Sequence, residues 1–175
     1  MTKKIESRLD KLDAKLERLF NDLEKYDTAQ LCKKPAPESW SAVQTLHHMM
    51  LSEKFSLAYC RKKLSFKPKL AKAGLTAAAR AKFVEYYLLS PFKFKAPPFI
   101  SGDALPEQDT LQNIREEWMN QRTEMRHFFK NMPAEYTDKE VYRHPFGGRL
   151  SLPGMLDFFG AHIRNHEKQI YRALK

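Results

Sequence analysis

Long stretches of this sequence repeat apolar residues every three or four positions, and this spacing most strongly limits the folds open to the chain. The first such run, between residues 5 and 23, is Ile5, Leu9, Leu12, Leu16, Leu19 and Leu23. The spacing puts these side chains on one face of an α-helix and leaves the charged residues on the other faces. Pro35 and Pro37 then interrupt the pattern, because proline cannot continue a helix.

Three further long helices are predicted, over residues 41–64, 109–132 and 151–174. Ser41 followed by Gln44 is the pattern of a capping box, in which two side chains satisfy the free amides of a helix start. The helix that follows is apolar over a wide arc, as expected for a helix in the centre of a bundle.

The other two long helices also begin with residues that cap helices well. Asp109 or Thr110 is placed to cap the third one, which Pro133 ends. Ser151 is placed to cap the last one, with Pro153 in its first turn.

The segments between these helices contain turn signals and one shorter helix. Residues 65–75 read as a loop, and Thr76 is placed to cap a short helix that Pro91 stops. Prolines from Pro91 to Pro106 oppose regular structure there, and the sequence HPFGGR reads as a turn. No convincing strand is present. We therefore expect an all-α four-helix bundle with a long, embellished crossover between the second and third long helices.

Chain length and composition set further limits. The 175 residues suit a single domain spanning 1–175. Two cysteines, Cys32 and Cys60, form neither a disulfide framework nor a CxxC metal motif, which favours a cytoplasmic, reducing compartment. The charged first residues do not resemble a signal peptide, no run of apolar residues is long enough for a membrane helix, and no glycine-rich phosphate loop occurs.

Positive charge is concentrated in one segment. The net charge is +10, and residues 61–95 hold ten basic residues against the single acid Glu85. Such a run is more commonly a solvated connector. The alternative is a surface for an anionic partner, including nucleic acid, although no nucleic-acid-reading motif accompanies it.

Two histidines are placed as metal ligands would be. His162 and His166 are one helical turn apart, so both project from the same face of the last helix, and that face is apolar. Two imidazoles at this spacing can bind one divalent metal ion. The alternative is a pair of core histidines bonded to carbonyls, carboxylates or water.

A third ligand would have to come from another helix. Adjacent His47 and His48 point about 100° apart on the second helix, and periodicity does not decide which faces the centre. The other one is expected on the helix flank. His127 reads as a residue near a helix C-terminus, and His144 as an exposed loop histidine.

No residue is identified as a general base. Glu53 and Tyr59 follow His48 on the same helix and are only neighbours of the candidate site. Both cysteines read as structural, and Trp40 is expected to pack across the start of the second helix.

Two stretches of the chain resemble signatures of the DinB/YfiT-like superfamily of metalloenzymes. They are ESWSAVQTLHHMMLSE in the second helix and HPFGGRLSLPGMLDFFGAHIRNHEKQI at the end, with KAPPF similar to the middle connection. The resemblance spans essentially the whole chain and implies a four-helix bundle with a three-histidine site for a divalent metal.

The resemblance also implies which residues form the site. The family's second-helix ligand falls eight residues after the tryptophan, which after Trp40 is His48, and its HxxxH pair falls on His162 and His166. Zinc or nickel is the expected metal. Some relatives are S-transferases that use low-molecular-weight thiols such as bacillithiol or mycothiol, others are thiol-dependent isomerases, and segment 61–95 could help hold an anionic thiol.

Three functions are therefore open from the sequence. The first is a metal-dependent thiol transferase, and the second is a non-enzymatic metal-binding or stress-response bundle. The third is a nucleic-acid-binding protein that uses residues 61–95. A homodimer is compatible with the apolar excess of the second helix, and no membrane partner is expected.

Overall fold

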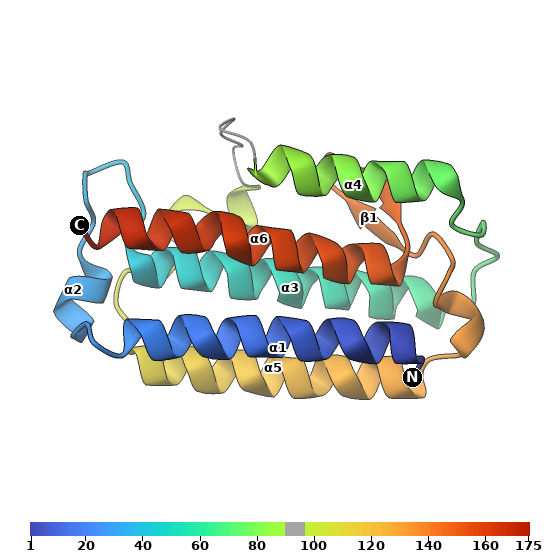
Figure 1. Cartoon of the computed structure of the whole chain (residues 1–175), viewed down its shortest axis with the longest axis horizontal. Coiled ribbons are helices and arrows are strands. Elements are labelled where there is room, and N and C mark those ends of the chain that lie inside the picture. The colour runs from blue at the N-terminus through green and yellow to red at the C-terminus, as the bar shows by residue number, and fades with distance from the viewer. Residues whose placement is uncertain (90–96) are drawn as a thin grey trace.

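The computed structural model describes residues 1–89 and 97–175. Four long helices form the bundle: α1 (Lys3–Leu23), α3 (Ala42–Ser65), α5 (Leu111–Asn131) and α6 (Leu152–Ala173). In Figure 1 the four helices lie side by side along the long axis of the molecule. The helix α6 packs on α1 and on α3, and α5 packs on the same two helices. The predicted all-α bundle is confirmed.

The long crossover lies between α3 and α5, where it was predicted. It contains α4 (Leu75–Leu89), which packs on the outer side of α6 (Figure 1). Two short 3₁₀ turns follow, η1 (Pro98–Ile100) and η2 (Gly102–Ala104), within the region expected to be irregular. The predicted end of the short helix at Pro91 lies outside the described residues.

The helix starts use the predicted caps. Ser41 and Gln44 form the capping box of α3, and each side chain accepts a hydrogen bond from the other's backbone amide at 3.1 Å. Thr110, rather than Asp109, caps α5, and Ser151 caps α6. The α4 helix begins at Leu75, one residue before its expected cap.

Three small elements were not predicted. A one-turn helix, α2 (Thr28–Cys32), is closed by a capping box between Asp27 and Gln30. A 3₁₀ turn, η3 (Ala134–Tyr136), follows α5. The expectation of no strand is wrong, because β1 (Tyr142–His144) and β2 (Gly148–Leu150) pair as an antiparallel hairpin around the predicted HPFGGR turn. Strands of three residues are too short to show an alternating pattern in the sequence.

A close approach in the hairpin turn requires glycine. A β-carbon at Gly147 would lie 2.2 Å from the side-chain Cγ2 atom of Val84 on α4. The next residue, Gly148, has a φ of 69°, which glycine adopts at little cost. The turn therefore packs directly on α4 and fixes β1 against the bundle.

The core lies between the four long helices. All six apolar residues of the first predicted stripe are buried, together with Trp118, Phe129 and Phe159. In the described part of the chain, no helix is both long enough and apolar enough to cross a membrane.

Candidate metal centre

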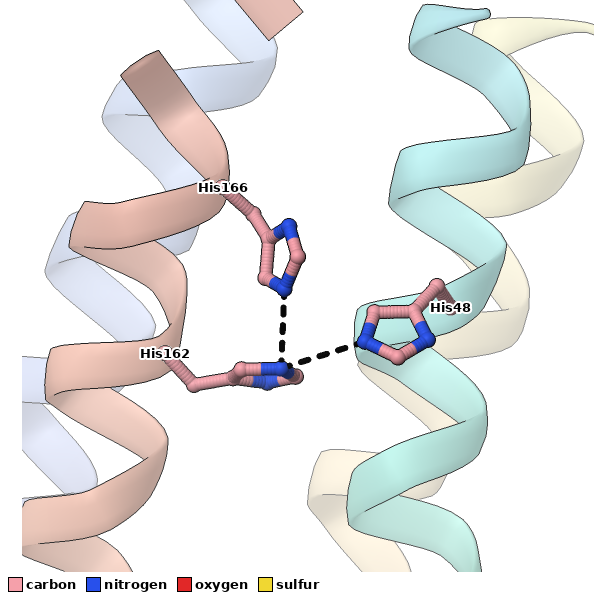
Figure 2. A group of neighbouring side chains, drawn as sticks. All are labelled: His48, His162 and His166. Atoms are coloured by element: carbon pink, nitrogen blue, oxygen red, sulfur yellow. Dashed lines mark hydrogen bonds between the residues drawn. The ribbon is translucent and has the colours of Figure 1, made fainter. Parts of the chain in front are cut away.

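Three buried imidazoles meet between α3 and α6. The Nε2 atom of His162 lies 3.2 Å from Nε2 of His48 and 3.0 Å from Nε2 of His166 (Figure 2). One ring nitrogen of each histidine lies within 4.8 Å of those of the other two. The cluster joins two helices that are far apart in sequence and adjacent in the bundle.

The local structure explains why these side chains converge. One turn of α6 separates His162 from His166, so their rings lie on the same face, as the spacing predicts. That face packs against α3, where His48 is the histidine directed at them. The family resemblance favours His48 over His47 as the ligand from this helix. In the structure, His48 is the one that lies beside His162.

The hydrogen bonds at the outer nitrogens orient two of the rings. His48 Nδ1 lies 2.7 Å from the carbonyl oxygen of Ile100, and His166 Nδ1 lies 2.9 Å from Oε1 of Gln169. Because an oxygen of this kind only accepts, the Nδ1 atoms carry the protons and the Nε2 lone pairs are left facing the centre. Such hydrogen bonds are typical of the histidines that bind metal ions.

The spacing of these nitrogens fits a shared metal ion. Metal–nitrogen bonds of about 2.1 Å place neighbouring ligand nitrogens about 3.0–3.4 Å apart in octahedral or tetrahedral geometry. Two of the three nitrogen separations in the cluster are 3.2 and 3.0 Å, and the third, between His48 and His166, is within 4.8 Å. The residues present therefore fit a divalent ion held by three imidazoles.

The electrostatics keep the imidazoles neutral, which metal binding requires. Burial lowers the pKa of His166 to about 3 and holds the pKa of His162 well below its usual range. Burial also lowers the pKa of His48, although the bond to the Ile100 carbonyl acts in the opposite direction. Each imidazole also disfavours a positive charge on its neighbours.

Aromatic rings hold two of the imidazoles in place. The Trp40 ring packs on His48 with centroids 4.9 Å apart, and the Phe158 ring stacks on His162 at 5.3 Å. Trp40 therefore packs across the start of α3, as expected, and it also contacts a candidate ligand. The contact between Trp40 and His48 depends on how the chain enters α3, so the sequence pattern alone does not predict it.

His47, expected on the flank of its helix, is instead buried in a contact between two helices. It is buried, and its Nε2 lies 2.9 Å from the carboxylate of Asp109. Asp109 also accepts bonds from the Thr110 amide and the Asn113 side chain. This contact connects α3 to the start of α5 and is separate from the cluster.

The expectation that His144 is exposed is wrong. Its side chain is 7% exposed, and its Nδ1 accepts hydrogen bonds from the backbone amides of Phe146 and Gly147. Its ring packs against Phe158, with centroids 4.5 Å apart, so it adjoins the aromatic residue that stacks on His162. The hairpin, which was not predicted, turns this residue inward.

The remaining candidates lie away from the cluster. Glu53 is buried between α3 and α5 with Arg122, and Tyr59 contacts Tyr142. Burial raises the pKa of Cys60, so the thiol stays protonated. The structure therefore brings none of these three candidates to the imidazoles.

His127 and Cys32 also stay outside the site. His127 lies near the end of α5, where it lines a surface cavity at the far end of the bundle. Cys32 is buried, and its Sγ lies 3.6 Å from the backbone carbonyl of Asp109. Neither residue offers a ligand atom to the three imidazoles.

The basic segment 61–95 covers the end of α3, a loop and α4. Some of its charges are paired with acids, as Arg61 is with Glu124 and Arg80 is with Glu140. Its last two lysines lie outside the described residues.

The comparison with known families agrees with the geometry of the site. A search of curated proteins gives no match. The profile of the DinB superfamily matches residues 8–170, which include both helices that carry the cluster and nearly all of the bundle. By this match, the chain belongs to the DinB superfamily.

Proposed function

We propose that this protein is an enzyme that depends on a divalent metal ion held by His48, His162 and His166. The convergence of the three buried Nε2 atoms is the observation that carries the proposal. Three imidazoles leave coordination positions open, which is typical of catalytic sites and not of closed structural ones. Imidazole nitrogen suits zinc and nickel, which are the metals we propose.

The reaction we propose is S-transfer from a low-molecular-weight thiol, of the bacillithiol or mycothiol kind, to an electrophilic carbon. A bound divalent ion supplies the positive charge that favours thiolate over thiol at neutral pH. In the transfer the thiol loses its proton, a sulfur–carbon bond forms, and the leaving group departs with the electrons of its bond to carbon. We base this reaction on the resemblance to DinB-like relatives, some of which are S-transferases that use such thiols.

The chain's own residues would orient the ligands and exclude water. Ile100 and Gln169 hold the Nδ1 protons of two imidazoles, so these rings keep their Nε2 lone pairs at the centre. Trp40 and Phe158 cover the rings of His48 and His162. A site held this rigidly needs little rearrangement on binding a metal ion.

Metal content measured by elemental mass spectrometry tests the site. We expect about one ion per chain in the wild type, and at least about tenfold less in His48→Ala and His162→Ala. His127→Ala is the matched control, since it removes a histidine outside the cluster. His47→Ala tests the assignment of the neighbouring residue and should keep its metal.

A thiol screen then tests the reaction. Metal-loaded protein should consume a thiol and an aryl halide to give a thioether identified by mass spectrometry, and His162→Ala should not. Wild-type protein without metal after reconstitution with zinc, nickel or manganese would contradict the site. Metal binding without turnover of any thiol would contradict the enzyme and favour the non-enzymatic alternative.

A further inference from the structure

A second charged site lies on a different face of α6 from the three imidazoles. A cavity of about 330 Å³ opens between α1, α4 and α6. Its lining includes two acidic side chains, Glu85 and Asp157, and five basic ones. The five basic residues are Arg8, Lys11, Lys15, Lys82 and Arg164.

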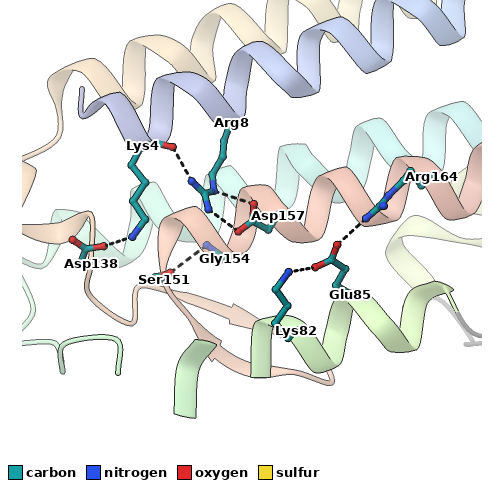
Figure 3. Close-up of polar contacts among 9 residues, drawn as sticks. All are labelled: Lys4, Arg8, Lys82, Glu85, Asp138, Ser151, Gly154, Asp157 and Arg164. Carbon is teal, nitrogen blue, oxygen red and sulfur yellow. Dashed lines mark hydrogen bonds and ion pairs between the residues drawn. The ribbon is translucent and has the colours of Figure 1, made fainter. Parts of the chain in front are cut away.

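Both acids of this cavity are already paired. Arg8 donates two hydrogen bonds to the Asp157 carboxylate, at 2.9 and 3.1 Å. Glu85 accepts one bond from Lys82 and one from Arg164, each at 2.8 Å (Figure 3). The charges of the two acids are therefore already engaged by Arg8, Lys82 and Arg164.

Lys11 and Lys15 are the cations that remain. Neither forms an ion pair with any residue in the described ranges. Burial and the nearby Arg164 and Arg18 guanidinium groups lower the pKa of Lys15, while the carboxylates of Glu167 and Glu85 act more weakly in the opposite direction. An ammonium group in these surroundings gains free energy from a nearby anion.

The floor of the cavity leaves open space beneath one of these lysines. A β-carbon at Gly160 would lie 3.8 Å from Nζ of Lys15, so the glycine leaves room beneath that ammonium group. The partly exposed guanidinium group of Arg164 also lines the cavity.

We propose that this cavity binds a phosphate group, as inorganic phosphate or as the end of a phosphomonoester. Lys11 and Lys15 supply positive charge that is in no ion pair of the described residues, and the guanidinium groups of Arg8 and Arg164 line the same cavity. Lysine and arginine are the usual phosphate-binding side chains. A cavity of about 330 Å³ is at the small end of ligand sites, which suits a compact, strongly charged group.

This site is independent of the proposed metal centre. Asp157, Gly160 and Arg164 follow one another at intervals of three and four residues on one face of α6. His162 and His166 lie on the face towards α3. Loss of metal binding therefore leaves the phosphate proposal standing, and the reverse also holds.

Isothermal titration calorimetry with sodium phosphate, at constant ionic strength, tests the proposal. We expect saturable binding to the wild type, weakened at least about tenfold by Lys15→Gln, which is the loss expected on removing one charge-assisted contact. Gly160→Ala should weaken binding several-fold by filling the floor. Its new β-carbon would lie 3.6 Å from Leu12, an ordinary contact, so the fold should be kept.

Two controls distinguish phosphate binding in this cavity from a general effect of net charge and from binding at the metal centre. Lys3→Gln removes the same charge from an exposed position on α1 outside the cavity, and it should bind phosphate as the wild type does. His162→Ala should also keep its affinity, because phosphate held by a metal ion at the imidazoles would be lost with it. A parallel titration with glycerol phosphate shows whether the free ion or the monoester binds more tightly.

Three results would overturn the proposal. The first is no saturable binding at millimolar phosphate. The second is an equal loss in Lys3→Gln and Lys15→Gln, which would show a general effect of net charge. The third is a loss in His162→Ala with full affinity in Lys15→Gln.

Discussion

The carboxylate of Glu53 and the guanidinium of Arg122 form an ion pair at 2.7 Å between α3 and α5. Both side chains are almost fully buried, and Trp118 donates a further hydrogen bond to Glu53 at 3.0 Å. Glu53 follows His48 by a little over one helical turn, but this pairing occupies both of its oxygens away from the imidazoles. The contact therefore assigns Glu53 a structural role.

Replacing Glu53 should affect stability and not metal binding. Glu53→Gln leaves the buried Arg122 charge with only its longer contact to Asp13, at 3.6 Å, and we expect the free energy of unfolding to fall by about 3 kcal/mol. Urea unfolding measures this loss, and elemental analysis of the folded protein should show unchanged metal content. Glu117→Gln, in an exposed pair with Lys54, is the control and should change stability by less than about 1 kcal/mol. Unchanged stability in Glu53→Gln would contradict the structural role.

Two glycine-to-alanine changes should have opposite effects. Gly147→Ala places a β-carbon 2.2 Å from Val84, so we expect a loss of about 1–3 kcal/mol from overpacking. Gly160→Ala meets only ordinary contacts and removes a glycine from the middle of α6, so we expect a gain of about 0.5–1 kcal/mol. Thermal and urea unfolding of the two variants measure both changes. Unchanged or raised stability in Gly147→Ala would show that the contact with Val84 does not limit the hairpin, and a loss in Gly160→Ala would contradict the expected gain in α6.

The buried His144 should make stability depend on pH. Burial lowers its pKa to about 4, whereas the unfolded chain titrates near its usual value of about 6.5. Both states are neutral above pH 6.5. Below that pH the unfolded state takes up a proton first, so the free energy of unfolding falls between about pH 6.5 and 4.

The variant His144→Gln isolates this contribution. We expect the free energy of unfolding to fall less steeply with decreasing pH than in the wild type, by up to about 1.4 kcal/mol per pH unit within this window. Urea unfolding at several pH values, with a chelator present throughout, measures the two slopes. Equal slopes would mean that His144 is protonated equally easily in the folded and unfolded states.

Removing the metal should destabilise the wild type. An ion that binds only the folded state at a hundred to a thousand times its Kd adds about 3–4 kcal/mol. We therefore expect a chelator to lower the Tm of the metal-loaded wild type and to leave that of His162→Ala unchanged. Equal shifts in both proteins would place the metal outside the three imidazoles.

Local patterns in the sequence determined the four long helices and the placement of two of the three clustered histidines. The apolar stripe from Ile5 to Leu23 predicts α1, and the pair Ser41 and Gln44 marks the start of α3. These features depend on residues three or four positions apart, which a helix brings together whatever the rest of the chain does. The placement of His162 and His166 on one face belongs to the same class.

Only the tertiary structure decided the contacts between distant segments. His47 and His48 have equally apolar neighbours in sequence, so periodicity could not separate them. The family resemblance selects His48, and the packing of α3 on α6 places His48 next to His162. His144 is buried because a hairpin of two three-residue strands folds it against Phe158. The cavity around Lys15 likewise combines side chains of three helices. Such contacts depend on how whole elements pack, a free energy that no short stretch of sequence contains.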